Sequence, residues 1–180
     1  MADQSKTGVT VLLTGLSGAG KSTIASALVH VLEEPPYERK PFLLDGDVVR
    51  KMQSAGLGFS KEDRNTHIRR VGALAAEHTA RGEFVVCAVI APYDDVRKEV
   101  RRMVEQEGRF LLVLVDTPLD VCEKRDPKGL YAKARAGVIQ QFTGVSDPYE
   151  VPTDAELAID TAKTTPEQAA TKILEYLAAN

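Results

Sequence analysis

The chain has 180 residues, of which 43% are hydrophobic, and its formal net charge is −3. This length and composition are enough to bury one good core, so we expect a single domain over residues 1–180. The acidic balance argues against binding to nucleic acid or to an anionic membrane surface. No run of 18 apolar residues is present and residues 1–8 are polar, unlike a signal peptide, so we expect a soluble, cytoplasmic protein.

The first predicted elements are a β-strand over residues 9–14 and a helix with apolar residues at helical spacing up to residue 32. Residues 15–22 lie between them and match the pattern G-x-x-x-x-G-K-[ST]. A strand, a glycine-rich loop and a helix in this order are typical of a phosphate-binding loop. The alternative is a glycine-rich turn that binds nothing.

The residue types of this loop suit the phosphates of ATP. Glycines allow unusual dihedrals, so that backbone N–H groups approach the phosphates, and the helix N-terminus adds its dipole. We expect Lys21 to reach the β- and γ-phosphates and the hydroxyl of Ser22 to bind Mg²⁺. The predicted nucleotide-binding residues of the loop are Gly15, Leu16, Ser17, Gly18, Ala19, Gly20, Lys21, Ser22 and Thr23.

The second predicted strand, residues 41–45, ends in Asp45-Gly46-Asp47. Ligands collect at the carboxyl ends of parallel strands, so we place both carboxylates in the site, beside the strand that leads into the phosphate loop. The alternative is an Asx turn that caps the next helix, which we expect over residues 48–55.

A longer helix is predicted over residues 60–81, with Ser60 as its N-cap and Gly82 as its stop. Its inner stripe consists of Ile68, Val71, Ala75 and His78. The densest basic stretch of the chain lies around its start, and from charge alone this stretch is either a ligand site or a solvated surface. Its members are Arg50, Lys51, Lys61, Arg64, Arg69 and Arg70.

The rest of the chain alternates strands with helices, which predicts an α/β fold of doubly wound type, a parallel sheet with helices on both faces. Further strands are expected over residues 84–90, 110–115 and 155–159, and helices after residues 93, 118 and 165. Residues 125–152 lack periodicity, and their aromatic residues Phe142 and Tyr149 favour a lid over a disordered segment. Cys87 and Cys122 have no C-x-x-C partner, so we expect two buried thiols.

Several stretches in this order resemble the adenylylsulfate kinases, which use MgATP to phosphorylate the 3′-hydroxyl of adenosine 5′-phosphosulfate (APS). The phosphate loop is common to many kinases, whereas the other stretches are specific, and together they span residues 9–152. The matching stretches are GLSGAGKST (15–23), LDGDVVR (44–50), LGFSKEDR (57–64), IRR (68–70), APY (91–93), RDPKGLY (125–131), ARAG (134–137), FTGV (142–145) and DPYE (147–150).

The resemblance implies a P-loop kinase fold and a role for each matching residue. Asp47 is the implied base or orienting group for the hydroxyl, and Lys21 and Lys128 neutralise the transferring phosphoryl group. Arg50 and Arg64 bind the phosphosulfate, and Phe59 and Phe142 enclose its adenine. Arg125 lies near the base of ATP, and Asp45, His67 and Ile90 complete the substrate site. The family also implies a homodimer and a functional link to ATP sulfurylase.

Three positions depart from the family pattern. His67 stands where asparagine is usual, and residues 137–142 lack the usual Glu, Lys and Gly before Phe142. Ala91 replaces a serine proposed as a phosphoserine intermediate, so we expect direct in-line transfer. Two alternatives remain open: a related kinase with another acceptor, and a nucleotide-binding module without catalysis.

Overall fold

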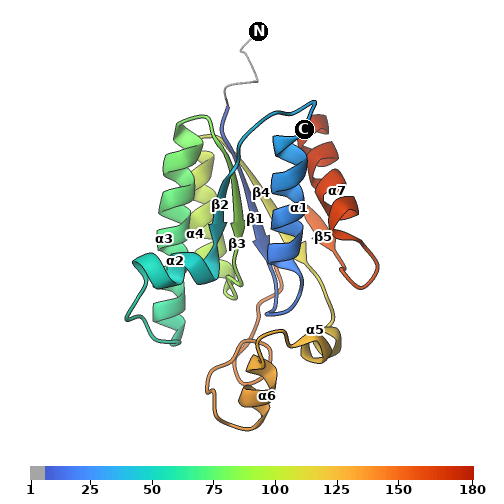
Figure 1. Ribbon diagram of the computed structural model, residues 1–180. Helices are drawn as coiled ribbons and strands as arrows, with labels where there is room; N and C mark the ends of the chain where they lie inside the picture. The colour runs from blue at the N-terminus through green and yellow to red at the C-terminus, as the bar shows by residue number, and fades with distance from the viewer. Residues whose placement is uncertain (1–6) are drawn as a thin grey trace.

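The computed structural model describes residues 7–180. The expectation that residues 1–8 are not a signal peptide falls mostly on residues 1–6, which lie outside the described residues. Five parallel strands form one sheet in the order β2-β3-β1-β4-β5 (Figure 1). The parallel pairing confirms the predicted fold class. The strands are β1 (Val9–Thr14), β2 (Phe42–Asp45), β3 (Phe84–Ala88), β4 (Arg109–Val115) and β5 (Leu157–Ile159).

Helices cover both faces of this sheet. α1 (Lys21–Glu33) and α7 (Pro166–Ala179) pack together on one face, and α3 (Lys61–Ala80) and α4 (Asp94–Glu105) on the other (Figure 1). Three shorter helices lie at or beyond the carboxyl ends of the strands, where the phosphate loop also lies. They are α2 (Gly46–Gln53), α5 (Leu119–Arg125) and α6 (Leu130–Arg135).

The central strands are mostly apolar because each of their faces meets a helical layer. Val11 and Leu13 of β1 belong to the core under α1 and α7, whereas Leu12 belongs to the core under α3 and α4. Successive side chains of a strand point to opposite faces, so a strand buried on both sides has few polar positions, and each polar side chain there needs a hydrogen-bond partner. Cys87 and Cys122 are buried free thiols, as predicted.

The placement of the second strand beside the first was wrong. β3 lies between β2 and β1, so the carboxylates after β2 are two strands away from the strand that leads into the phosphate loop. The order of strands in a sheet does not follow their order in the chain. The carboxylates nevertheless reach the loop, because Asp45 contacts the first turn of α1 through Ser22.

Several predicted boundaries shift for local reasons. α2 begins at Gly46 rather than residue 48, because the side chain of Asp45 caps it. β3 ends at Ala88 rather than residue 90, because the carbonyls of Ile90 and Ala91 accept hydrogen bonds from side chains. α6 lies inside the segment 125–152, where no helix was expected.

The predicted N-cap of α3 is confirmed, and α7 also begins with a side-chain cap. The side chain of Ser60 accepts a hydrogen bond from the backbone N–H of Asp63, and Thr165 with Gln168 forms a complete capping box. Each cap satisfies backbone donors that a helix start leaves without partners.

Within residues 7–180, no helix has both the length and the apolar composition needed to cross a membrane.

Candidate active site

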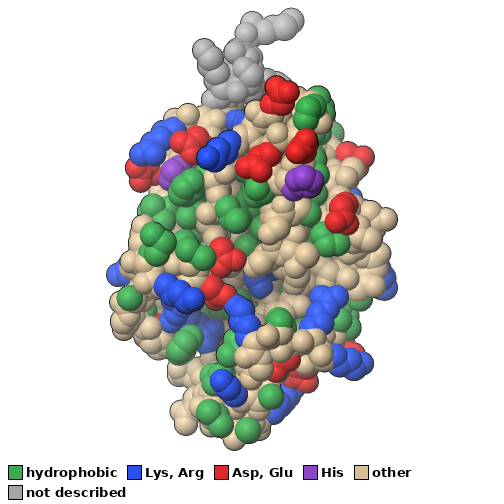
Figure 2. Space-filling model, viewed as in Figure 1, with side chains coloured by type: hydrophobic (Ala, Val, Ile, Leu, Met, Phe, Trp, Pro, Cys, Tyr) green, Lys and Arg blue, Asp and Glu red, His purple; other side chains and the backbone are tan. Residues whose placement is uncertain are grey.

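A cleft of about 690 Å³ opens at the carboxyl ends of the strands, between the sheet and the segment 125–152, which we call the lid segment. Figure 2 shows Lys and Arg side chains around a hollow in the lower half of this face, with acidic side chains beside them. Sixteen of the predicted site residues line the cleft: Ser17, Gly18, Gly20, Lys21, Ser22, Thr23, Asp45, Asp47, Arg50, Phe59, Arg64, His67, Ile90, Arg125, Lys128 and Phe142. Gly15, Leu16 and Ala19 shape the loop from behind this lining.

The phosphate loop has the backbone that its glycines predict. Gly15 has φ 154° and Gly20 has φ 105°, both in the region that L side chains rarely adopt. A Cβ atom on Gly15 would lie 2.6 Å from the carbonyl oxygen of Val115. Gly20 is the N-cap of α1 and has no side chain to cap it, so the first N–H groups of the helix stay available to an anion.

Lys21 folds back over the loop. Its ammonium group donates hydrogen bonds to the carbonyl oxygens of Gly15, at 2.9 Å, and Leu16, at 2.7 Å. Burial lowers the pKa of Lys21 to about 8. Since a phosphate favours the charged ammonium, this lysine suits a polyanionic ligand.

Asp45 performs both of the roles that the sequence left open. Its Oδ1 accepts hydrogen bonds from the backbone N–H groups of Asp47, at 2.9 Å, and Val48, at 3.4 Å, and so caps α2. Its Oδ2 accepts the hydroxyl proton of Ser22 at 3.0 Å. A serine hydroxyl has one proton and two lone pairs, so Ser22 keeps its lone pairs for a cation.

Asp47 and Lys128 form an ion pair across the mouth of the cleft. They are 81 residues apart in the chain, one in the first turn of α2 and the other in the lid segment. Two of the three residues with predicted catalytic roles therefore meet.

The basic stretch around the start of α3 faces the cleft through two arginines. The guanidinium of Arg50 lies 4.6 Å from the ring centre of Phe59, which is 58% exposed. Arg64 donates to the carbonyl of Phe59 at 2.8 Å, and also to Thr143 and to the carbonyl of Gln141. Arg64 thereby joins α3 to the lid segment.

The two aromatic residues expected around the adenine have different surroundings. Phe142 is buried and meets the ring of Tyr131 edge-on, with the ring centres 5.0 Å apart. Phe59 is exposed at the mouth of the same cleft. A planar group between them would therefore meet one buried and one exposed ring.

His67 lies against α2 rather than free in the cleft. It is 7% exposed, and its Nδ1 shares a hydrogen bond of 3.0 Å with the hydroxyl of Ser54, the C-cap of α2. Burial, together with Arg50 and Arg70, lowers its pKa to about 4. The imidazole is therefore neutral near pH 7 and supports the helix that carries Asp47.

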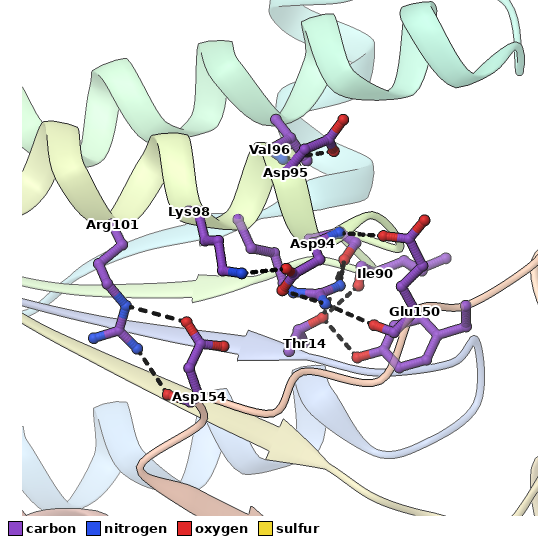
Figure 3. Close-up of polar contacts among 12 residues, drawn as sticks. Thr14, Ile90, Asp94, Asp95, Val96, Lys98, Arg101, Glu150 and Asp154 are labelled. Carbon is purple, nitrogen blue, oxygen red and sulfur yellow. Dashed lines mark hydrogen bonds and ion pairs between the residues drawn. The ribbon is translucent and has the colours of Figure 1, made fainter.

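The far end of the lid segment is anchored by a network that the sequence did not reveal (Figure 3). Arg97 is 1% exposed and donates to the carbonyls of Ala91, at 2.7 Å, and Glu150, at 2.6 Å. Beside it, Tyr149 and Thr14 share a hydrogen bond of 2.9 Å. The anchor that Tyr149 was expected to provide is present, but no sequence pattern singled out the buried arginine.

A family model described as "Adenylylsulphate kinase" matches residues 7–160 of this chain. The chain belongs to the adenylylsulfate kinase family. This membership confirms the resemblance and favours the kinase interpretation over a nucleotide-binding module without catalysis.

Curated and solved members of the family match over nearly the whole chain. The adenylyl-sulfate kinase of Rippkaea orientalis is 52% identical over 170 residues, 94% of this chain and 91% of that protein. A structure of the Mycobacterium tuberculosis APS kinase in complex with AMPPNP and APS superposes with a TM-score of 0.90, at 38% identity, over 95% of this chain and 98% of that one.

The chain also matches part of a longer relative. The sulfate adenylyltransferase of Aspergillus oryzae is 51% identical over 156 residues, which are 87% of this chain and 27% of that protein.

Among residues 7–180, no cluster of three or more His, Cys, Asp or Glu side chains is arranged to hold a metal.

Proposed function

We propose that this protein transfers the γ-phosphoryl group of MgATP to the 3′-hydroxyl of APS. The observation that carries the proposal is the cleft itself, which places a phosphate-binding loop and the Asp47–Lys128 pair around one space. The family membership supports the same reaction. Phosphoryl transfer depends mainly on positioning and on charge stabilisation, and both are supplied here by side chains already held by neighbours.

The loop end of the cleft would hold the nucleotide. The backbone of residues 15–20 and the N-terminus of α1 suit the phosphates, and Lys21 adds a positive charge. Mg²⁺ neutralises charge on the β- and γ-phosphates, and Ser22 would hold it with the lone pairs that Asp45 leaves free. Arg125 lines the cleft beyond the loop, which supports its assignment to the base of ATP.

Asp47 would orient the acceptor hydroxyl or accept its proton. Lys128 shares its carboxylate and so can move its charge toward the transferring group. In a direct transfer the 3′-oxygen forms its bond to phosphorus as the β–γ bridging bond breaks, and the proton passes to Asp47. Ala91 supports this route, because a buried methyl group cannot carry a phosphoryl group.

The other end of the cleft would hold APS. Stacking of a base on an aromatic ring contributes about 1–3 kcal/mol, and a hydrogen bond to a charged group about 1.5–3 kcal/mol. Phe59 with Phe142 and Arg50 with Arg64 could therefore retain a small dianion on a protein with negative net charge. Arg64 would have to give up contacts with the lid segment, which ties acceptor binding to lid position.

We also infer a single kinase domain over residues 1–180, a cytoplasmic location and a homodimer. Exposed apolar residues along the open edge of β2 and on α2, Leu43, Val48 and Met52, support self-association. The family relative that is a sulfate adenylyltransferase supports a functional link to ATP sulfurylase. Sedimentation of the purified chain tests the dimer, and a monomer at micromolar concentration would contradict it.

A product assay tests the reaction. Purified protein with MgATP and APS should give a 3′-phosphorylated product, identified by chromatography, whereas Lys21→Ala should give almost none. Absence of that product, with ATP still bound, would overturn the choice of acceptor.

Transfer from a chiral γ-thiophosphate should invert the configuration at phosphorus, because a single in-line displacement inverts it, and retention would contradict direct transfer.

A further inference from the structure

The carbonyl oxygen of Ala19, within the phosphate loop, accepts hydrogen bonds from two threonines outside the loop. Thr117 follows β4 and donates at 2.9 Å, and Thr161 follows β5 and donates at 2.7 Å. The two hydroxyl oxygens are themselves 2.7 Å apart. One backbone carbonyl is therefore held by the ends of two neighbouring strands.

The direction of this carbonyl determines the direction of the next N–H group. The peptide bond from Ala19 to Gly20 is trans, since the described residues have their cis bond at Pro35–Pro36. In a trans peptide the C=O and N–H groups point in opposite directions. Because the threonines hold the carbonyl, the N–H of Gly20 is turned the other way, within the loop whose donors suit phosphate.

Thr161 also contacts Gly20 through its methyl group. A Cβ atom on Gly20 would lie 3.1 Å from Cγ2 of Thr161, and Gly20 has φ 105°. The methyl group therefore abuts the residue whose unusual dihedral opens the helix. Its hydroxyl orients the peptide and its methyl limits how far the peptide can rotate back.

At Thr161 the direction of one hydrogen bond in this cluster is fixed by Arg125. A guanidinium can only donate, and Nη1 of Arg125 donates to the hydroxyl oxygen of Thr161 at 2.7 Å. The proton of Thr161 therefore points away from Arg125, toward the carbonyl of Ala19 and the hydroxyl of Thr117, each 2.7 Å from its oxygen. Arg125 closes α5 at the start of the lid segment, so the cluster connects that segment to the phosphate loop.

We propose that Thr117 and Thr161 are positioning residues that hold the phosphate loop in its nucleotide-binding form, and that Thr161 links Arg125 to that form. The inference rests on the nucleotide site of the proposed function but not on the identity of the acceptor. Neither threonine belongs to the loop motif, and their distance from it in the chain hides the relation.

The test uses substitutions that separate the hydroxyl from the methyl group. Thr161→Val keeps the shape and removes the donor, whereas Thr161→Ser keeps the donor. Affinity for a non-hydrolysable ATP analogue with Mg²⁺ is measured on the full chain by calorimetry. A lost hydrogen bond to the loop should weaken binding about tenfold in Thr161→Val and Thr117→Val, while Thr161→Ser should stay within about twofold of wild type.

Two further readouts separate positioning from stability. Thr171→Val is the matched control, since Thr171 makes its hydroxyl contact to Glu167 within α7, and it should bind the analogue like wild type. Amide hydrogen exchange of residues 16–22 in nucleotide-free protein should quicken in Thr161→Val and remain slow in Thr171→Val. If Thr117→Val fails to fold, Thr161, which is only partly buried, carries the test by itself.

Three outcomes would overturn the inference. They are wild-type analogue affinity in Thr161→Val, equal weakening in the Val and Ser variants, and a lower melting temperature with unchanged affinity and exchange. Failure of the proposed function is distinguishable, because APS would then give no product while analogue binding still responds to Thr161→Val.

Discussion

At the scale of single residues, neighbours outside the motifs determine what the motif residues can do. Lys21 donates hydrogen bonds to two loop carbonyls, and Ser22 donates a hydrogen bond to Asp45. Asp47 is paired with Lys128. The sequence identified these residues because their types and spacings are specific to phosphate chemistry, but their hydrogen-bond partners come from segments with no motif in common.

Substitution of Asp47 tests its role toward the acceptor hydroxyl. Asp47→Asn should lower kcat by about 10²–10⁴, the range for loss of a general base, while MgATP affinity stays within about twofold of wild type. Steady-state kinetics and nucleotide titration measure both quantities. The matched control is Asp95→Asn, at an exposed carboxylate of α4 that pairs with Lys61. Undiminished turnover in Asp47→Asn would remove Asp47 from the mechanism.

The lowered pKa of Lys21, about 8, predicts a pH dependence of nucleotide affinity. Bound phosphates favour the charged ammonium, and the free protein loses that charge as pH rises through its pKa. Affinity should therefore fall by up to about tenfold per pH unit above about pH 8, with proton uptake on binding. Calorimetry in buffers of different ionisation enthalpy measures the uptake. Lys21→Arg should remove the dependence, and constant wild-type affinity to about pH 9.5 would contradict it.

At the scale of elements, the lid segment and the contact between α3 and α4 depend on close packing. Phe142 rests against Tyr131, and Arg97 with Tyr149 holds the far end of the segment. Gly72 lets α3 approach α4, since a Cβ atom there would lie 2.6 Å from a methyl carbon of Val100. The sequence predicted a lid from its two aromatic residues, but an isolated glycine inside a helical pattern did not reveal its neighbour.

Phe142→Ala tests whether the lid segment contributes to the acceptor site. Loss of a stacking ring should weaken APS binding by about 1–3 kcal/mol and MgATP binding much less. Isothermal titration of each ligand measures the split. Val138→Ala is the matched control, because Val138 is an exposed residue of the same segment. Equal losses for the two ligands would place the ring outside the APS site.

Gly72→Ala tests the helix contact. Alanine normally stabilises a helix interior by about 1 kcal/mol relative to glycine, but the overlap with Val100 should reverse the sign and destabilise the protein by about 1–3 kcal/mol. Urea denaturation measures the free energy of unfolding. Adding Val100→Ala should recover part of the loss that Gly72→Ala causes. A single variant more stable than wild type would show that α3 and α4 can separate.

At the scale of the whole molecule, the sheet brings its strand ends together and the layers bury the groups that support them. His67 is buried between α3 and α2, and Arg97 under the end of the lid segment. Such buried polar groups couple the site to the stability of the fold, because each one needs its partner in place.

His67 predicts how global stability depends on pH. Its pKa is about 4 in the folded protein, against about 6.5 in an unfolded chain. Between these values the unfolded state binds more protons, so stability falls as pH falls and is lower by about 2 kcal/mol at pH 5 than at pH 7. Urea denaturation at both pH values measures the difference. His67→Asn should remove this share of the loss, and an equal loss in both proteins would contradict the burial effect.

The sequence was sufficient to predict most of the elements, the fold class, the phosphate loop and the family, because each depends on patterns within short stretches, whereas the short α6 was missed. Strand periodicity, helix caps and the glycine spacing of residues 15–22 are local properties. Most predicted site residues line one cleft, and several of them, such as Asp45 and Lys21, do so because they end a strand or open a helix.

Which of these stretches meet depends on the three-dimensional arrangement of the whole chain. This arrangement placed β3 between β2 and β1, paired Asp47 with Lys128, and brought Thr117 and Thr161 to the carbonyl of Ala19. A threonine after a buried strand was the available sign, but many threonines occupy such positions without a shared acceptor. Contacts between distant segments depend on strand order and on packing of the whole core, and no stretch of the chain encodes these separately.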